Sequence, residues 1–197
     1  MSTQEHQPLT TGQKWTLAAA AVCAAGAVLL AALPMDWIEE VFGVERPNGH
    51  VVLAWSASKG KGGAGSFDFP NTHGRVVELD LVNRSVVSEL QIWNPDYAFA
   101  YPALAVDAKD EVGVILGWGG ASNHANCAMG IIGDFVVWYQ NGSTRTVKRY
   151  GDYLTTRPAA RNSRLFAGYG YYVTSVSGDS SSCTYHPIYV RYGRASA

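Results

Sequence analysis

The chain has 197 residues, which is room for one domain and an additional segment. Its formal charge at pH 7 is −1, and from Pro47 onward 13 Lys and Arg stand against 11 Asp and Glu, a balance of about +2. Neither sign dominates, which argues against nucleic acid or a strongly charged surface as the main partner. Only 16% of the residues are charged, and one long uncharged segment accounts for part of that low share.

This uncharged, Ala-rich segment extends from Trp15 to Met35. As a helix it would reach roughly 30 Å, the thickness of the hydrocarbon core of a bilayer. No polar face recurs at the helical period, which disfavours a helix buried in a domain. The run is long for a signal peptide, and no small-x-small cleavage motif precedes Met35. We therefore predict a transmembrane helix or signal-anchor over residues 15–35, with a cleaved signal peptide and a secreted protein as the alternative.

The charges that flank this segment orient it. Lys14 and the α-amino group precede it, and acidic residues follow it, at positions Asp36, Glu39, Glu40 and Glu45. The positive-inside rule then predicts a cytoplasmic tail over residues 1–14 and a C-terminal part outside the cytoplasm. Residues 36–49 are expected to be a juxtamembrane linker, in which residues 36–46 have the character of a short amphipathic collar.

Residues 50–197 are predicted to form an extracytoplasmic all-β domain. Short runs rich in Val, Ile, Tyr and Trp alternate with turn residues, as half-buried strands do. The expected strands cover residues 50–57, 75–82, 86–93, 102–108, 111–118, 130–140, 144–150, 165–176 and 187–193. Asn141-Gly142 is a strong hairpin signal. Residues 58–74 and 175–183 are expected to be loops, and the Gly–Lys spacing of the first does not fit a phosphate-binding loop.

Several of these segments resemble the strand–turn–strand units of exported bacterial β-propellers of the sialidase-like superfamily. "YPALAVDAKDEVGVILGW" (101–118) resembles the first hairpin of a blade, and "LDLVNRSVVSELQI" (79–92) resembles an outer hairpin. "RYGDYLTTRP" (149–158) resembles the start of the following blade. The resemblance covers about residues 50–192 and implies antiparallel, propeller-like blades.

The length of the chain limits this resemblance. A blade takes about 40–45 residues and a closed propeller usually has four to eight blades. Residues 50–192 supply only about three. The sequence therefore predicts a partial propeller, with a small β-sandwich as the alternative. An open sheet leaves edges that must be covered, so a homo-oligomer or another envelope protein is an expected partner.

The catalytic pattern of sialidases is not reproduced. The repeated Ser-x-Asp-x-Gly-x-Thr-Trp motif of that superfamily is absent, and the neighbours of Arg46-Pro47 do not match those of the first sialidase arginine. Arg157 and Arg191 are the remaining candidates for an arginine cluster. Asp107 and Asp110 are expected to cap their own hairpin rather than to act as a catalytic pair. We predict no catalytic residue and no cofactor, and a sialidase-like glycoside hydrolase or its remnant is the alternative.

Two cysteines of the predicted domain, Cys127 and Cys183, are the disulfide candidate. In an oxidising compartment a bridge between them would close a loop of roughly 55 residues and would stabilise the domain by about 3–4 kcal/mol. Two buried free thiols are one alternative. A zinc site with His124 and His186 is another, since the four residues form a His-x-x-Cys and a Cys-x-x-His pair. The bridge and the free thiols are favoured over a metal site.

Aromatic residues carry the prediction of function. Exposed Trp and Tyr on a rigid β scaffold stack on sugar rings or anchor a protein partner. Trp118, beside Gly119-Gly120 at a strand end, Tyr153 and its neighbour Asp152 are the binding candidates, with core packing as the alternative for the two aromatic residues. The sequence predicts a membrane-anchored domain that binds carbohydrate or an envelope protein.

Overall fold

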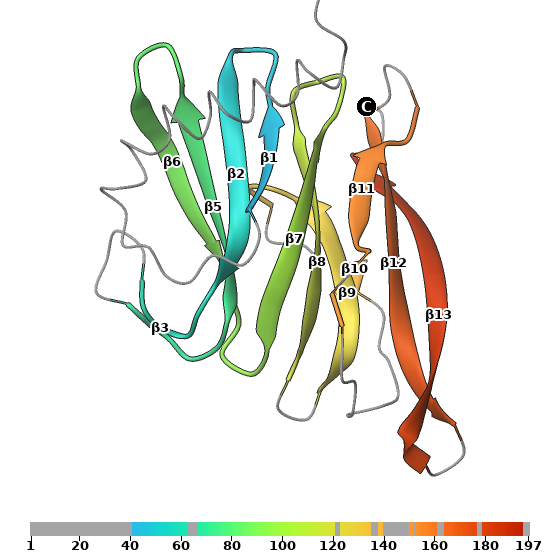
Figure 1. Cartoon of the computed structure of the whole chain (residues 1–197). Coiled ribbons are helices and arrows are strands. Elements are labelled where there is room, and N and C mark those ends of the chain that lie inside the picture. Colours follow the sequence, from blue (N-terminus) through green and yellow to red (C-terminus); the bar gives the residue numbers. More distant parts are fainter. Residues whose placement is uncertain are drawn as a thin grey trace, which may run out of the picture. The chain divides into compact units, whose positions relative to one another are not determined.

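All regular elements in the described part of the chain are β-strands, most of them in three antiparallel sheets (Figure 1). This computed structural model describes residues 41–62, 67–120, 123–134, 138–139, 150–151, 153–160, 164–176 and 179–194. Among them, no helix has the length and apolar character to cross a membrane. The predicted membrane segment, residues 15–35, lies outside the described residues. The predicted all-β, antiparallel class is confirmed.

The first sheet is an antiparallel meander with the strand order β1-β2-β5-β6. Its strands are β1 (Val41–Glu45), β2 (His50–Ala57), β5 (His73–Asp80) and β6 (Ser85–Ile92). A short hairpin of β3 (Gly60–Lys61) and β4 (Asp68–Phe69) is inserted between β2 and β5. The sheet therefore keeps the order of the chain, and each of its strands pairs with the next.

The second and third sheets follow in the same manner. The second contains β7 (Ala98–Val106), β8 (Val112–Gly120), β9 (Asn123–Ile131) and β10 (Trp138–Tyr139), and the third contains β11 (Thr155–Pro158), β12 (Leu165–Val176) and β13 (Asp179–Gly193). Their strand orders are β10-β9-β8-β7 and β11-β12-β13. Figure 1 shows the three sheets one after another, with the strands of each running in roughly the same direction.

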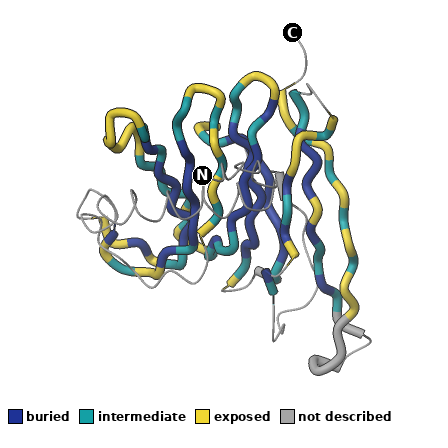
Figure 2. Tube along the Cα trace, turned by 45° about the horizontal axis from the view of Figure 1, so that its top comes forward, coloured by how far each residue is buried: buried dark blue, intermediate teal, exposed yellow. Residues whose placement is uncertain are grey.

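The second sheet is packed between the other two. Its side toward the first sheet carries Val114, Leu116 and Trp118, which form one core cluster with Val52 and Val76. Its opposite side carries Ile115, Cys127 and Met129, which pack against side chains of β13 such as Ile188 and Val190. Because both sides of the second sheet are buried, the sequence of β8 is an almost continuous run of apolar residues. Figure 2 shows the buried residues along the inner strands and the exposed residues at the hairpin ends.

Glycines allow the second and third sheets to approach closely. A Cβ atom on Gly113 of β8 would lie 2.7 Å from ring carbons of Phe166 in β12. In return, a Cβ atom on Gly170 of β12 would lie 2.7 Å from Cys127 Sγ in β9. Each sheet thus lacks a side chain at a point where the other sheet places one, so the two surfaces interlock.

Most predicted strands are present. The expected strands at 50–57 and 165–176 coincide with β2 and β12. The strand expected over residues 130–140 is wrong as a single element, because a turn interrupts it: Asp134 N–H donates to the carbonyl of Ile131 at 3.0 Å, and Gly133 has a φ of 94°. The predicted loop 175–183 is also partly wrong, since β13 already begins at Asp179.

Five strands were not expected: the short β3 and β4, which lie inside the predicted loop 58–74, and β1, β9 and β11. β1 begins at Val41, inside the predicted linker 36–49, and pairs with β2 over its whole length. β9 contains "NHANCAMGI", which is poor in β-branched residues and is held by pairing with β8. β11 is only four residues long. Pairing with neighbouring strands, rather than local composition, forms these elements. The Asn141-Gly142 hairpin lies outside the described residues.

The interlocking of the sheets predicts that Gly113→Ala destabilises the domain. The new methyl group would overlap the ring of Phe166, and overpacking of this kind costs about 1–3 kcal/mol. The matched control is Gly74→Ala in β5, where the nearest atom to the added Cβ is Leu116 Cδ2 at 3.4 Å. Urea unfolding of the full chain measures the unfolding midpoints of both variants. Equal unfolding midpoints for the two variants would contradict close packing at Gly113.

Candidate functional site

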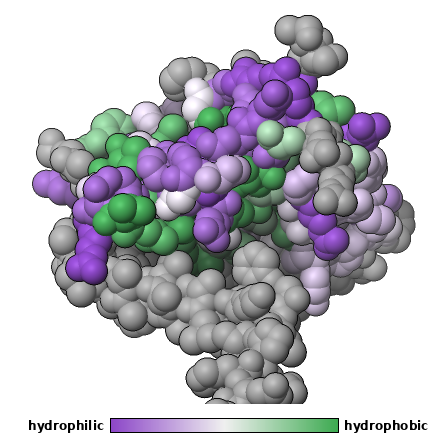
Figure 3. All heavy atoms as spheres, turned by 90° about the horizontal axis from the view of Figure 1, so that it is seen from above, coloured by the Kyte–Doolittle hydropathy of each residue, from purple (hydrophilic) through white to green (hydrophobic). Residues whose placement is uncertain are grey.

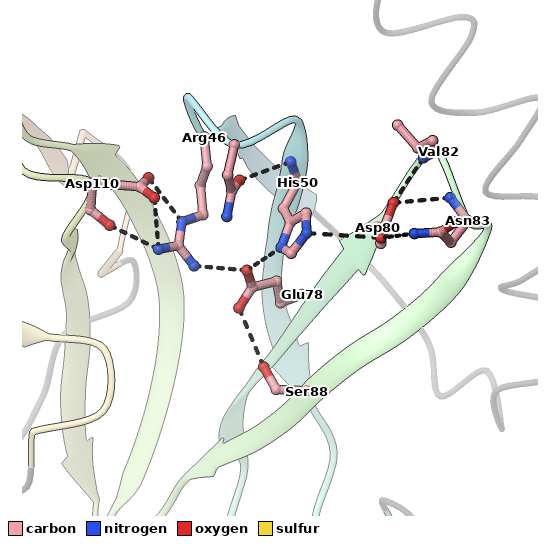
Figure 4. Close-up of polar contacts among 9 residues, drawn as sticks. Arg46, His50, Glu78, Asp80, Val82, Asn83, Ser88 and Asp110 are labelled. Atoms are coloured by element: carbon pink, nitrogen blue, oxygen red, sulfur yellow. Dashed lines mark hydrogen bonds and ion pairs between the residues drawn. The ribbon is translucent and has the colours of Figure 1, made fainter.

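Polar side chains at the hairpin ends join the first sheet to the second (Figure 4). Arg46, in the β1–β2 turn, donates from Nη1 to Glu78 Oε1 at 2.6 Å and from Nε to Asp110 Oδ1 at 2.9 Å. Its Nη2 donates to the backbone carbonyl of Asp110 at 2.9 Å. The hydrogen bond to Asp110, in the β7–β8 turn, is the main reason why the pKa of Arg46 is raised. A single guanidinium thus bridges two sheets.

His50 extends this network along the first sheet. Its Nδ1 lies 2.7 Å from Glu78 Oε1, and its Nε2 lies 3.9 Å from Asp80 Oδ2. The Asp80 carboxylate accepts hydrogen bonds from the backbone N–H groups of Asn83 and Val82, at 2.9 and 2.8 Å. These hydrogen bonds, that from Asn83 first, lower the pKa of Asp80. Because the carboxylates are already occupied by partners, the network fits a structural clamp better than a catalytic site.

The β7–β8 turn is also held from the third sheet. Arg194, after β13, contacts the Glu111 carboxylate and donates from Nη2 to Asp134 Oδ1 at 2.9 Å. Within the turn, Asp107 Oδ1 accepts the N–H groups of Lys109 and Glu111 at 2.8 and 2.9 Å. The expectation that Asp107 caps its own hairpin is confirmed, whereas the carboxylate of Asp110 binds Arg46. Seen from above (Figure 3), hydrophilic side chains gather over this end of the described surface, with hydrophobic atoms between them.

A cleft of about 420 Å³ lies between the first and second sheets. One wall comes from the end of β6 and the residues after it, including Leu90, Ile92 and Trp93. The opposite wall comes from β8, β9 and the turn after β9, and includes Trp118 and Asp134. Its volume falls in the range of small-molecule sites, and its lining combines apolar and aromatic walls with a few polar groups, as such sites usually do.

Aromatic rings concentrate at one end of this cleft. Trp93 is 41% exposed, and its ring lies 4.7 Å from that of Phe67 and 5.9 Å from that of Phe69. Tyr97 packs on Trp118 with a centroid distance of 4.9 Å. Trp93 is therefore an accessible ring on a fixed aromatic support. At the other end of the cleft, Asp134 is already bound by Arg194.

The structure separates the predicted binding residues. Trp118 is 6% exposed and belongs to the core cluster that faces the first sheet, although it also lines the cleft. Tyr153 is 89% exposed with a φ of 72°, and its neighbour Leu154 packs on the opposite side of the second sheet. Asp152 lies outside the described residues. Trp118 thus packs in the core, and the structure gives no common site for Trp118 and Tyr153.

Cys127 is a free, fully buried thiol in this structure. Burial raises its pKa to about 11. Its sulfur faces Gly170 of β12, whereas the backbone of Cys183 pairs with Ser175, five positions further along β12. The predicted Cys127–Cys183 bridge is therefore not formed here. The side chain of Cys183 lies outside the described residues, so the packing of Cys127 fits the free-thiol alternative for that residue alone.

Of the zinc ligands considered from the sequence, Cys127 and His186 are described, whereas the side chains of His124 and Cys183 lie outside the described residues. His186 Nε2 lies 2.7 Å from Thr174 Oγ1, and its ring stacks on Tyr172. Within the described ranges, no group of three His, Cys, Asp or Glu residues is placed to hold a metal ion. Arg157 and Arg191 are paired with the same residue of β12, Ala167, from opposite sides, so they share one face of the third sheet, away from the cleft.

No known protein family, curated protein or solved structure matches this chain. The choice of candidate site residues therefore rests on the geometry of the structure alone. Sequence reasoning missed Arg46 as a clamp because its partner Asp110 is 64 residues away. It also missed Trp93, although a Trp followed by Asn-Pro at a strand end was a visible signal for an exposed aromatic residue.

The clamp predicts that Arg46→Met destabilises the domain by about 1–3 kcal/mol, because the Glu78 and Asp110 carboxylates would lose charged hydrogen-bond partners. The control is Lys109→Met, an exposed cation in the β7–β8 turn. Urea unfolding at low salt and at 1 M NaCl measures the free energy of unfolding of both variants. The loss of stability in Arg46→Met should be smaller at high salt, because the charges are screened. A Lys109→Met variant as unstable as Arg46→Met would disprove the clamp.

Burial of the Cys127 thiol predicts that it resists alkylation in the native state. At pH 8, well below a pKa of about 11, little thiolate forms, so iodoacetamide should leave Cys127 unmodified until a denaturant is added. Peptide mass spectrometry without reductant reads out the result. If Cys127 remained unmodified in denaturant and reacted only after reduction, Cys127 would be in a disulfide, as the sequence predicted for the pair with Cys183.

Proposed function

We propose that this chain is a membrane-anchored, extracytoplasmic β domain that binds carbohydrate. Residues 15–35 would be the anchor, and the cleft between the first and second sheets would be the binding site. The observation that carries the proposal is the accessible ring of Trp93 in the lining of this cleft, which Tyr97 and Trp118 line as well. Binding of an envelope protein is the alternative occupant.

The chemistry of the cleft favours a neutral sugar. A pyranose ring has an apolar face that stacks on Trp or Tyr and hydroxyl groups that need hydrogen-bond partners at the edge. Asn94 lies beside Trp93 in the cleft lining and is only partly exposed. The lining that the structure describes contains no Lys or Arg, so an anionic ligand has no counter-charge there.

We also propose that the three sheets are propeller-like blades. Two observations support this: the sheets are meanders in chain order, and consecutive sheets make contact through their first strands, β1 with β7 and β7 with β11. The three sheets alone would then make an open, partial propeller, and closure of a ring by further copies of the chain in a homo-oligomer is the alternative.

The sialidase-like alternative has less support. Such an enzyme requires arginines and carboxylates in one pocket, but among the described residues of the cleft there is a single carboxylate, Asp134, which is engaged by Arg194. Arg157 and Arg191 lie on the third sheet. We propose no catalytic residue.

The proposal predicts that the full chain in a neutral detergent binds neutral oligosaccharides and that Trp93→Ala weakens this binding about tenfold, the equivalent of ~1.4 kcal/mol. Isothermal titration with cello-, malto- and chito-oligosaccharides measures it. Tyr153→Ala is the matched control, an exposed aromatic outside the cleft lining.

The two variants separate the possible sites. Loss of binding in Tyr153→Ala but not in Trp93→Ala would move the site to the residue predicted from the sequence. If the native chain bound none of the oligosaccharides, carbohydrate binding in the cleft would be refuted.

A further inference from the structure

The outer face of the third sheet, turned away from the second sheet, carries tyrosines and arginines. Strand pairing places Arg157, Ala167 and Arg191 in one row across the sheet, and Thr155, Tyr169 and Tyr189 in the next. Directly paired residues of antiparallel strands project to the same side. The opposite side is identified by Phe166, which lies against Gly113 of the second sheet, so these two rows face outward.

The tyrosines of this face are accessible. Tyr169 and Tyr189 are 43% and 53% exposed, and their rings lie 5.1 Å apart. Tyr185, further along β13, is 53% exposed as well. Exposed aromatic rings side by side on a rigid strand pair form a platform with little conformational entropy to lose on binding.

The charged side chains described in the two rows of this face are both cationic. Arg157 and Arg191 are both exposed, and neither makes an ion pair with a described residue. Among the side chains described in its rows there is no Asp or Glu. The two arginines stand two strands apart, about 10 Å, with the small side chain of Ala167 between them. The face thus combines adjacent aromatic rings with two guanidinium groups that have no carboxylate partner among the described residues.

We propose that this outer face of the third sheet binds an acidic polysaccharide whose sugars carry carboxylate groups. Guanidinium groups recognise carboxylates through paired hydrogen bonds, and the neighbouring tyrosines would stack on the sugar rings between the acidic groups. Two cations on one row suit an extended polyanion rather than a single small anion. The site is separate from the proposed cleft, because the second sheet lies between them.

The test uses the full chain in a neutral detergent, with polygalacturonate as the probe and the same polymer with its carboxylates reduced to alcohols as the comparison. The native protein should bind the acidic polymer, with an affinity that falls as NaCl rises. Arg157→Gln and Arg191→Gln should each weaken binding about tenfold. Tyr189→Ala should weaken it several-fold, whereas Arg84→Gln, an exposed cation in the β5–β6 turn, should leave it unchanged.

The outcomes also separate this proposal from the cleft. Trp93→Ala should leave polygalacturonate binding intact, and Arg157→Gln should leave neutral-oligosaccharide binding intact. Equal binding of the reduced polymer, or an equal effect of Arg84→Gln, would overturn the proposal. A homo-oligomer that Arg191→Gln and Tyr189→Ala dissociate in light scattering would overturn it too, since a second copy of the chain would then occupy this face.

Discussion

The burial of both sides of the second sheet is the constraint on which the rest of the structure depends. Ile115 and Leu116 are neighbours in β8, point to opposite sides and are both fully buried. A sheet with two apolar sides needs a partner layer on each, and the first and third sheets supply these layers. Removal of either layer would expose the apolar side chains that it covers, so the three sheets depend on one another.

Electrostatics reinforces this stack at the hairpin ends. The β7–β8 turn receives Arg46 from the first sheet and Arg194 from the third, so the middle layer is held from both sides at one end. Partly exposed ion pairs contribute modestly to stability, and here they tie the β7–β8 turn to the first and the third sheet at the same end of the stack. The apolar packing contributes most of the free energy of folding.

The two proposed ligand surfaces arise where this stacking stops. The cleft lies between the end of β6 and the facing strands β8 and β9, where Trp93 is exposed, Tyr97 is partly buried and Trp118 is buried. The tyrosine–arginine face exists because no further described layer covers the third sheet. The described lining of the cleft is concave and contains no cation, whereas the outer face of the third sheet is open and carries two arginines, so the two surfaces suit ligands of different chemistry.

The sequence by itself determined the all-β class and most strand positions, because Val-, Ile- and Tyr-rich runs broken by turn residues report local backbone preference and burial. It also indicated that Asp107 caps its hairpin, a contact within four residues. Only the tertiary structure decided that β1 and β9 are strands, that Trp118 is core, that Cys127 faces Gly170 and that Arg46 reaches Asp110. These features depend on contacts between residues far apart in the chain, and local composition carries no record of which segments meet.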